Sequence, residues 1–330
     1  MDALRHFQHA QTFRLLAQDL SGQMSVERLA DHLSALADTI LEATIKGCWR
    51  LLQGPGAPPP RFAIVGYGKL GGKELGYASD LDLVFLYEAD PDNPADEGAQ
   101  ERYARLGQRI NTWLTSATAA GRLYETDLRL RPDGAAGLMV SSLAAFERYQ
   151  REQAWTWEHQ ALTRARFVAG DAGIGTAFES IRDDVLRQPR DTAKLAVDVI
   201  DMRARMAAAH ADPSPEFDLK HDRGGMVDIE FVVQFLLLAH AHRHRELTRN
   251  AGNIALLSIA AQAAADAYRE YRRLQHQIRL TGAPHARVDP GPQSARRAAV
   301  DALWEHALGP RPDRLEFALR KRGDARHVDG

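Results

Sequence analysis

A short glycine-rich segment between two apolar runs sets the strongest limit on the fold of this 330-residue chain. Residues 62–66 and 80–87 each have the pattern of a β-strand, and only residues 67–79 separate them. The segment from Gly66 to Gly71 fits the G-x-G-x-x-G pattern of dinucleotide-binding folds. A parallel crossover, however, needs about a dozen residues for its helix, and glycines interrupt this segment repeatedly. We therefore interpret it as a turn whose backbone amides can approach phosphate oxygens.

Of two other interpretations of this segment, one is excluded by the sequence and one is not. The phosphate-binding loop of P-loop enzymes is excluded, because Glu74 follows Lys73 where a serine or threonine would hold magnesium. A tight turn that binds nothing stays open, since many turns need glycine for their backbone conformation alone.

Two aspartates begin the second apolar run. Asp80 and Asp82 are two residues apart, so a strand places both carboxylates on one face while Leu81, Leu83 and Phe85 face the core. Like charges this close repel each other, and each resists desolvation. Divalent cations would relieve both costs, and oxygen ligands without cysteine or histidine favour Mg²⁺ or Mn²⁺. The alternative is a solvated strand end at which Asp80 caps a turn.

A third strand is expected over residues 123–131. Its alternation sets Asp127, Arg129 and Arg131 on one face of the sheet. A carboxylate followed by two arginines could supply a third metal ligand and cationic cover for a polyphosphate. A ladder of cross-strand ion pairs on a solvated sheet face is the alternative.

The remaining pattern indicates an α+β fold, in which a small mixed sheet with helices is followed by a larger all-helical domain. Helical periodicity covers residues 3–22, a segment from a Ser25 cap to about residue 52, and residues 100–118. From Ser142 onward the pattern is almost entirely helical. We expect three domains: N-terminal helices over 1–53, a catalytic core over 61–140, and a helical domain with a polar C-terminal tail over 141–330.

Composition limits the partners and the compartment. The formal net charge of −2 argues against a broad electrostatic contact with nucleic acid or an anionic membrane. The single cysteine, Cys48, excludes an internal disulfide framework and a zinc site built from cysteines. The N-terminal residues do not have the pattern of a signal peptide, and the longest apolar run, 231–239, is too short to span a bilayer. We expect a cytoplasmic protein.

Four sequence blocks resemble those of a known protein family. The glycine turn, the paired aspartates and the later carboxylate resemble the nucleotidyltransferase superfamily that shares the catalytic fold of DNA polymerase β. The resemblance is closest to the glutamine synthetase adenylyltransferases. It rests on GYGKLGGKELGYASDLDL at 66–83, DLRLRPDG at 127–134, WTWEHQALTRAR at 155–166 and KHDRGGMVDIEF at 220–231.

That family implies an activity and an architecture. Its members usually carry two related nucleotidyltransferase halves: one attaches AMP from ATP to a tyrosine of glutamine synthetase and releases pyrophosphate, and the other removes the AMP by phosphorolysis. Only one half is present here. Residues 127–134, 157–160 and 221–228 resemble the attaching half. The chain is therefore expected to be a fragment, an excised domain or a naturally split form.

The resemblance also implies roles for individual residues. Asp80 and Asp82 would hold two Mg²⁺ ions, which Mn²⁺ could replace, and Asp127 would complete the site. These three aspartates are the expected catalytic residues. The expected nucleotide-binding residues are Gly66, Gly68, Lys69, Ser79, Arg129, Arg131 and Lys220. From the residue types alone, Trp155 and Trp157 are expected in the core, with stacking on a base as the alternative.

The resemblance also implies regulators, and the sequence allows other functions. In the family, glutamine and the PII signalling protein set the direction of modification, so both are expected regulators. The closest alternative is the AMP-removing activity, which would use the same fold and metals. A non-catalytic docking module is a second alternative, and transfer of AMP to a small molecule such as an aminoglycoside is a third that the fold permits.

Overall fold

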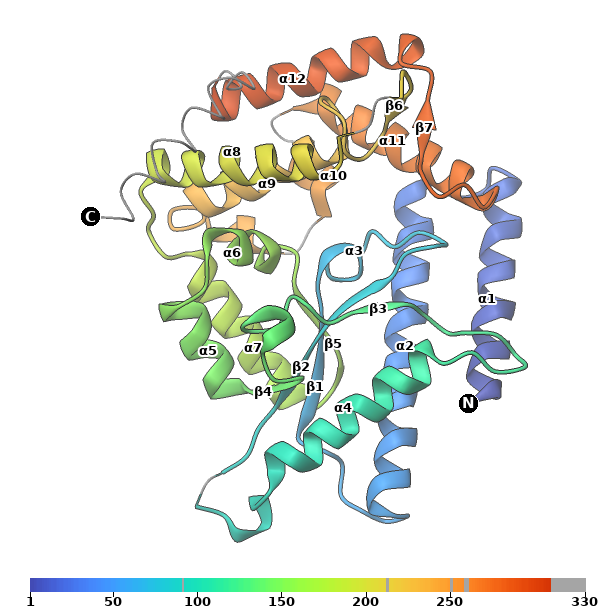
Figure 1. The fold of residues 1–330 in the computed structure, drawn as a ribbon, viewed down its shortest axis with the longest axis vertical. Coiled ribbons are helices and arrows are strands. Elements are labelled where there is room, and N and C mark those ends of the chain that lie inside the picture. Colours follow the sequence, from blue (N-terminus) through green and yellow to red (C-terminus); the bar gives the residue numbers. More distant parts are fainter. Residues whose placement is uncertain (91, 212–213, 250–251, 258–260, 310–330) are drawn as a thin grey trace. The chain divides into compact units, whose positions relative to one another are not determined.

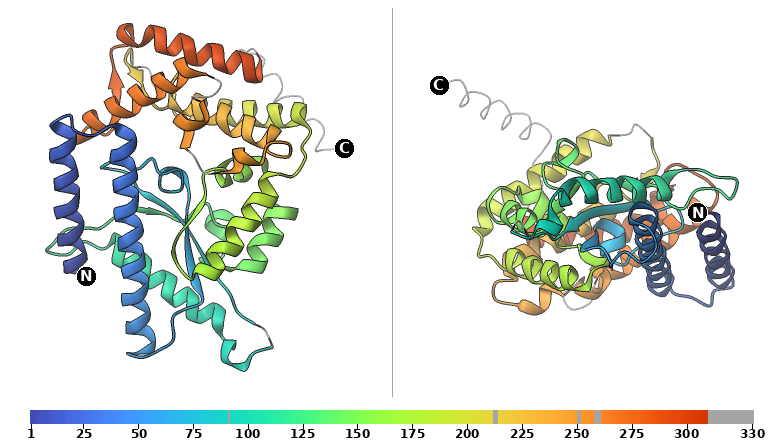
Figure 2. Two further views of the ribbon diagram at one scale, coloured as in Figure 1. Left: turned by 180° about the vertical axis from the view of Figure 1, so that it is seen from behind. Right: turned by 90° about the horizontal axis from the view of Figure 1, so that it is seen from below.

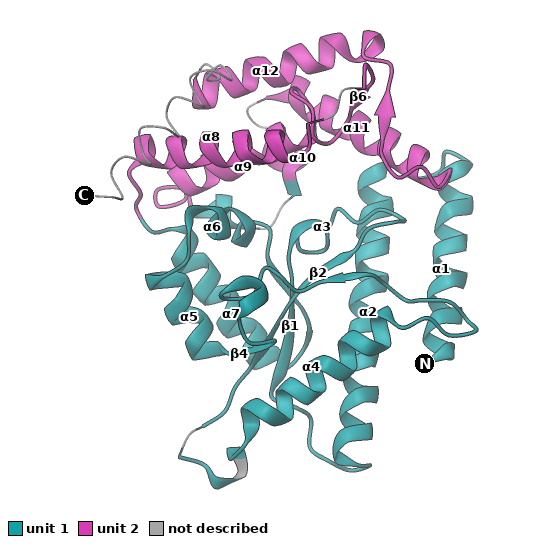
Figure 3. Ribbon diagram, viewed as in Figure 1, with its two compact units in different colours: residues 1–188, 245–252 teal, residues 189–244, 253–330 magenta. Residues whose placement is uncertain are grey.

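The computed structural model describes residues 1–90, 92–211, 214–249, 252–257 and 261–309. The chain forms two compact units, which Figure 3 distinguishes by colour: unit 1 contains residues 1–188 and 245–252, and unit 2 contains residues 189–244 and 253–330. Unit 1 extends past residue 140, because elements that follow this residue pack on the sheet of the expected catalytic core. Most of the expected polar tail, residues 310–330, lies outside the described residues.

Long helices open unit 1, as the sequence predicts. The hydroxyl oxygen of Ser25 accepts a hydrogen bond from the amide of Arg28 and so caps α2, which ends at Gly54 with a positive φ of 88°. The first two helices, α1 and α2, lie side by side in Figures 1 and 2. The helices of unit 1 are α1 (Asp2–Leu20), α2 (Val26–Gln53), α3 (Gly68–Gly71), α4 (Ala99–Thr115), α5 (Leu143–Glu152), α6 (Thr156–Leu162) and α7 (Ala172–Leu186), with short 3₁₀ turns at Pro94–Asp96, Gly134–Ala136 and Arg245–Thr248.

A mixed five-stranded sheet forms the centre of unit 1 (Figure 1). Its order is β3-β2-β1-β5, and β4 shares the β3 edge of β2. Strands β1 and β5 run antiparallel to their neighbours, whereas β3 and β4 run parallel to β2. The strands are β1 (Phe62–Gly66), β2 (Leu81–Tyr87), β3 (Thr126–Asp127), β4 (Val140–Ser142) and β5 (Arg166–Gly170). The first two confirm the strands predicted from apolar alternation.

Two expectations about strands were wrong. The strand expected over 123–131 contains only Thr126 and Asp127, because the chain already turns at Arg129, whose amide donates to the Asp127 side chain. The segment after Ser142 was expected to be helical almost throughout, but residues 166–170 form β5. This strand satisfies the main-chain groups on the second edge of β1, a long-range requirement that local periodicity does not reveal.

Helices cover both faces of the sheet. Phe62, Ile64, Leu83 and Phe85 point to one face and belong to a buried cluster with the apolar stripes of α2 and α4. On the other face α7 contacts β1 and α5 contacts β2, and the Phe146 and Phe178 rings of these helices lie 5.7 Å apart. Successive side chains of a strand point to opposite faces, so residue 82, next to Leu83, points to the face that α5 and α7 cover.

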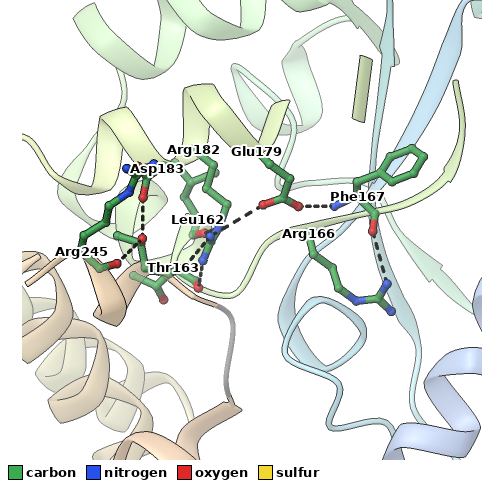
Figure 4. A network of polar contacts seen from close by, with 9 residues as sticks. Leu162, Thr163, Arg166, Phe167, Glu179, Arg182, Asp183 and Arg245 are labelled. Carbon is green, nitrogen blue, oxygen red and sulfur yellow. Dashed lines mark hydrogen bonds and ion pairs between the residues drawn. The ribbon is translucent and has the colours of Figure 1, made fainter. Parts of the chain in front are cut away.

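A segment distant in sequence belongs to unit 1. The guanidinium of the buried Arg182 donates to the carbonyls of Leu162, Thr163 and Thr248. The Asp183 carboxylate accepts a 2.5 Å hydrogen bond from the Thr248 hydroxyl and lies 3.3 Å from Arg245. Figure 4 shows this network, which attaches residues 245–248 to α7.

Unit 2 is largely helical, as expected from the pattern. Its buried cluster is built around α9 and α11 and includes Ile229, Val233, Tyr268 and Tyr271. None of the helices in the described part of the chain is both long and apolar enough to cross a membrane. The elements are α8 (Thr192–Ala209), β6 (Phe217–Asp218), α9 (Met226–His240), α10 (Gly252–Leu257, which begins at the last residue of unit 1), α11 (Gln262–Leu280), β7 (Arg287–Val288), a 3₁₀ turn at Gly291–Gln293 and α12 (Ser294–Leu308).

One buried ion pair organises the start of α9. The Asp228 side chain is fully buried, and its Oδ1 accepts a 2.6 Å hydrogen bond from Nε of Arg203 on α8. Its Oδ2 accepts from the amide of Gly224, and Arg203 also donates to the carbonyl of His221. Asp228 therefore connects α8, the glycine-containing loop and α9.

Replacement of Asp228 should therefore destabilise unit 2. Asp228→Ala leaves the Arg203 guanidinium buried without its carboxylate, which we expect to lower the free energy of unfolding by about 3–5 kcal/mol. Urea denaturation measures the loss. Asp266→Ala, which removes an exposed partner of Arg269, is the control and should change stability by less than about 1 kcal/mol. Equal losses for the two variants would contradict this account.

Candidate functional site

Strand pairing brings two of the predicted aspartates together. In the parallel pair of β2 and β3, Asp82 lies opposite Asp127, and the Leu81 amide donates to the Glu125 carbonyl at 3.0 Å. Side chains at paired positions of parallel strands point to the same face of the sheet. The two carboxylates therefore project from one sheet face although 45 residues separate them in sequence.

The third aspartate lies just before β2. Asp80 is exposed, whereas Asp82 and Asp127 are half-buried. Arg129 connects the three electrostatically: its guanidinium makes hydrogen bonds of 2.5–3.0 Å to Asp127, and its pKa is raised mainly by Asp127, with smaller contributions from Asp82 and Asp80. One cation thus lies within the field of all three carboxylates.

This arrangement keeps Asp127 ionised. The Arg129 hydrogen bonds hold the pKa of the Asp127 carboxyl below its usual range, and they outweigh the opposing effect of partial burial. An ionised carboxylate is the form that binds a metal ion.

The donor set fits a hard divalent cation, although the side-chain arrangement does not yet form a metal centre. Carboxylate oxygens are the ligands that Mg²⁺ and Mn²⁺ prefer, and the strand register supplies two of them from neighbouring strands. Within the described ranges, no group of three or more His, Cys, Asp or Glu side chains is positioned to hold a metal ion. Asp127 faces the Arg129 guanidinium, so a metal would have to replace this cation.

The glycine turn packs directly against this site. Gly68 has a φ of 53°, and a Cβ added there would collide with Oδ2 of Asp82. The amide of Tyr67 donates to the Asp82 carbonyl at 2.9 Å, which fixes the turn to β2 from the other side of the same residue. Glycine is therefore required at position 68 both by the backbone conformation and by the closeness of a predicted metal ligand.

The other predicted residues of this region lie on the turn or beside it. Gly66 ends β1, where an added Cβ would come within 2.9 Å of the Leu70 and Val168 side chains. Lys69 lies on α3 and is half-buried. The Ser79 hydroxyl accepts a hydrogen bond from the Gly76 amide and so closes the turn that leads into β2. The predicted phosphate contacts of Gly66, Gly68, Lys69 and Ser79 stay predictions.

The two arginines after Asp127 do not share the face that alternation predicted. Arg129 pairs with Asp127, but the Arg131 guanidinium donates to the carbonyls of Leu128, Ala135 and Gly137. The reason is the early end of β3, after which the chain curls around the Arg131 side chain. In this structure Arg131 holds the loop after β3 in place.

Lys220 belongs to unit 2, where it is exposed on the loop before α9. The amides of Lys220 and His221 both donate to Oδ1 of Asp218, which shapes this loop. The His221 ring lies 4.0 Å from the His210 ring, measured between centroids. The role of Lys220 in binding nucleotide stays a prediction.

Sequence reasoning missed one feature of the site and misplaced two residues. Glu74 and Arg164 form a buried ion pair next to the glycine turn, which no local pattern connects because 90 residues separate them. Trp155 and Trp157 were expected in the core, but their relative exposures are 70% and 37%. Trp155 lies at the N-cap of α6, where its own amide donates to Glu158, so the backbone rather than the ring is held.

The loop of His221 should make unit 2 sensitive to acid. Burial lowers the pKa of His221 to about 4, helped by nearby positive charge and opposed by Asp218, against an ordinary value of 6.5. The folded state therefore favours the neutral ring, and its stability should fall as the pH drops from about 6.5 towards 4, where the unfolded chain binds more protons. Melting temperatures at pH 7 and pH 5 test this. His221→Gln should reduce the difference, whereas His306→Gln, at an exposed position of α12, should leave it unchanged.

A methyl group at position 68 should disrupt the site. Gly68→Ala places a Cβ against Asp82 at a positive φ, which costs about 1–2 kcal/mol in backbone strain alone. We expect the affinity for ATP, measured by calorimetry with Mg²⁺, to fall at least about tenfold as the turn shifts. Gly98→Ala is the matched control, because its φ of 68° gives a similar strain while an added Cβ meets nothing within 4 Å. If both variants bind ATP like the unmodified chain, the turn does not contact the nucleotide.

Comparison with known protein families divides the chain in two. Residues 1–181, more than half of the chain, match the family described as glutamate-ammonia ligase adenylyltransferase. Residues 195–286 match the family described as GlnD PII-uridylyltransferase. The first match covers the sheet, the glycine turn and all three aspartates.

Curated relatives match almost the whole chain. Proteins named bifunctional glutamine synthetase adenylyltransferase/adenylyl-removing enzyme are 57% identical over 319 residues in Aromatoleum aromaticum and 54% identical over 334 residues in Nitrosomonas europaea. A Bordetella bronchiseptica protein of that name is 54% identical over 318 residues. The matches cover 93–94% of this chain but only 33–35% of the relatives, so the chain spans about a third of their length. The resemblance inferred from the sequence blocks is confirmed: the chain belongs to the glutamate-ammonia ligase adenylyltransferase family.

Proposed function

We propose that this chain transfers AMP from ATP to a tyrosine hydroxyl of glutamine synthetase and releases pyrophosphate. The observation that carries the proposal is the register of β2 with β3, which sets Asp82 opposite Asp127 beside the glycine turn. The names of the relatives support an adenylyltransferase, and Asp80 adds a third carboxylate at the same end of β2. This combination supports phosphoryl-transfer chemistry better than a docking module, because a module has no physical need for crowded carboxylates.

Asp80, Asp82 and Asp127 would hold Mg²⁺, as two ions in the arrangement that the resemblance implies, and Mn²⁺ could substitute. Bound metal would neutralise charge on the phosphates and favour ionisation of the acceptor hydroxyl. The chain's own residues prepare this site: Asp82 is held between the turn and β3, and Arg129 keeps Asp127 ionised before a metal arrives. A tyrosine hydroxyl has an ordinary pKa near 10 and therefore needs such activation.

Phosphate binding is assigned to the backbone of Gly66, Gly68 and Lys69, with Ser79 supporting the turn that joins them to β2. Arg129 would move from Asp127 to a phosphate when metal binds, because its side chain is mostly exposed and close to all three aspartates. Arg131 would act through the loop that it holds. Lys220 is proposed as a further phosphate contact on the basis of the sequence resemblance alone.

Attachment of AMP is proposed over its removal because residues 127–134, 157–160 and 221–228 resemble the attaching half of the family. Control by glutamine and by the PII protein is part of the proposal only at the level of the family, and no residue is assigned to it. A cytoplasmic location is likewise proposed from the single cysteine and the expected acceptor protein.

Label transfer tests the proposed activity. The chain is incubated with α-labelled ATP, Mg²⁺ and unmodified glutamine synthetase, and the label on the synthetase is measured. We expect label with the unmodified chain and at least about a thousandfold less with Asp80→Asn/Asp82→Asn, because metal ions contribute several kcal/mol to such transition states. The control is Asp266→Asn on the surface of unit 2.

Two results would redirect the proposal. If the chain transfers no label but releases ADP from AMP-modified glutamine synthetase in the presence of phosphate, the removing activity is correct. If neither reaction occurs and the chain still binds glutamine synthetase, it is a docking module.

A further inference from the structure

The segment that precedes β5 packs tightly against the glycine turn. An added Cβ at Gly71 would collide with the carbonyl oxygen of Arg164, and one at Gly72 would lie 2.8 Å from Nε of the same arginine. Both the backbone and the side chain of Arg164 therefore lie against the turn. The absence of side chains at positions 71 and 72 is what allows this contact.

The Arg164 side chain is held by a carboxylate at the end of the turn. Its Nη2 donates a 2.5 Å hydrogen bond to Oε2 of Glu74, and the two side chains are only 11% and 5% exposed. Gly252, in the segment that returns to unit 1, lies beside this pair, since an added Cβ would be 3.7 Å from Oε1 of Glu74. A pair this buried depends on both partners, because either one alone would leave an uncompensated charge.

The residue between the turn and this pair is strained. Lys73 is a non-glycine residue with a φ of 53°, a conformation that costs about 1–2 kcal/mol for an L-residue. The Glu74 amide donates to the Lys69 carbonyl at 2.7 Å, which returns the chain onto the turn. Strained backbone of this kind persists only where surrounding contacts determine it, and the Arg164–Glu74 pair supplies that contact on the far side of Lys73.

We propose that Arg164 and Glu74 are positioning residues that hold the glycine turn in the conformation in which it binds the ATP phosphates. This inference rests on the proposed function, which assigns the phosphates to the turn. The pair acts through the backbone of residues 68–73 and does not itself contact the nucleotide, because both side chains are almost fully buried. Nucleotide affinity, rather than affinity for the protein acceptor, should therefore depend on the pair.

Three variants of the full chain test the proposal: Glu74→Gln, Arg164→Lys and the double variant. Arg5→Lys is the matched control, since Arg5 is also buried and donates to three carbonyls elsewhere in unit 1. We expect each single variant to bind ATP with Mg²⁺ about tenfold more weakly in calorimetry, and the double variant to be no weaker than the singles. In label transfer, the KM for ATP should rise while the KM for glutamine synthetase stays within about twofold.

Two outcomes would overturn the proposal. If Arg164 contacts a phosphate directly, Glu74→Gln would free it, so this variant would bind ATP at least as tightly as the unmodified chain while Arg164→Lys alone would be weakened. If the pair only stabilises the fold, Arg5→Lys would weaken ATP binding to the same extent at an equal loss of melting temperature.

Hydrogen exchange separates this proposal from the proposed function. The amides of residues 68–73 should exchange faster in Glu74→Gln and Arg164→Lys than in the unmodified chain or Arg5→Lys, with no nucleotide present. This result is expected even if glutamine synthetase is not the acceptor. Unchanged exchange at the turn would overturn the positioning role whether or not the chain binds ATP.

Discussion

Strand β2 makes main-chain hydrogen bonds along both edges, and the candidate site depends on this pairing. Strand β1 occupies one edge and carries the glycine turn at its end, while β3 occupies the other edge and carries Asp127. Asp82 lies between the two, with its carbonyl bonded to the turn and its side chain on the same sheet face as Asp127. A slip of one residue in either pairing would turn Asp82 or Asp127 to the opposite face, into the cluster under α2 and α4.

The site concentrates like charge and unusual backbone, and surrounding contacts compensate for both. Arg129 is hydrogen-bonded to Asp127, lowers the pKa of that carboxyl and interacts electrostatically with Asp82 and Asp80, so the repulsion among the carboxylates is partly offset before any ligand binds. The left-handed residues Gly68 and Lys73 lie on a turn that is held by Asp82 on one side and by Arg164 on the other. Asp82 belongs to the strand that follows the turn, whereas Arg164 is distant in sequence, and the two contacts together hold the turn.

Unit 1 is completed by parts of the chain outside the expected catalytic core. Strand β5 and helix α7 follow residue 140, yet β5 pairs with β1 and α7 covers the sheet. Residues 245–248 return to α7 through the Arg182 and Asp183 network (Figure 4). A core cut at residue 140 would lose both the second edge of β1 and the Arg164 contact beneath the turn. Residues 155–166, one of the four blocks that resemble the family, include Arg164, and its contact with the turn gives a structural reason for part of this block.

The sequence by itself determined the local features of this protein. Apolar alternation located β1 and β2, the Ser25 cap located the start of α2, and the spacing of Asp80 and Asp82 placed two carboxylates at one strand end, because these features depend on neighbours within a few residues. Only the tertiary structure decided that β3 is two residues long, that Arg131 turns into its own loop, and that Arg164 lies beneath the glycine turn. Each of these outcomes depends on which strands pair and which buried charged groups form hydrogen bonds in the folded chain. The partners of β3 and of Arg164 lie tens of residues away in sequence, and Arg131 bonds to carbonyls three to six residues away only because β3 ends early, so no local pattern predicts these outcomes.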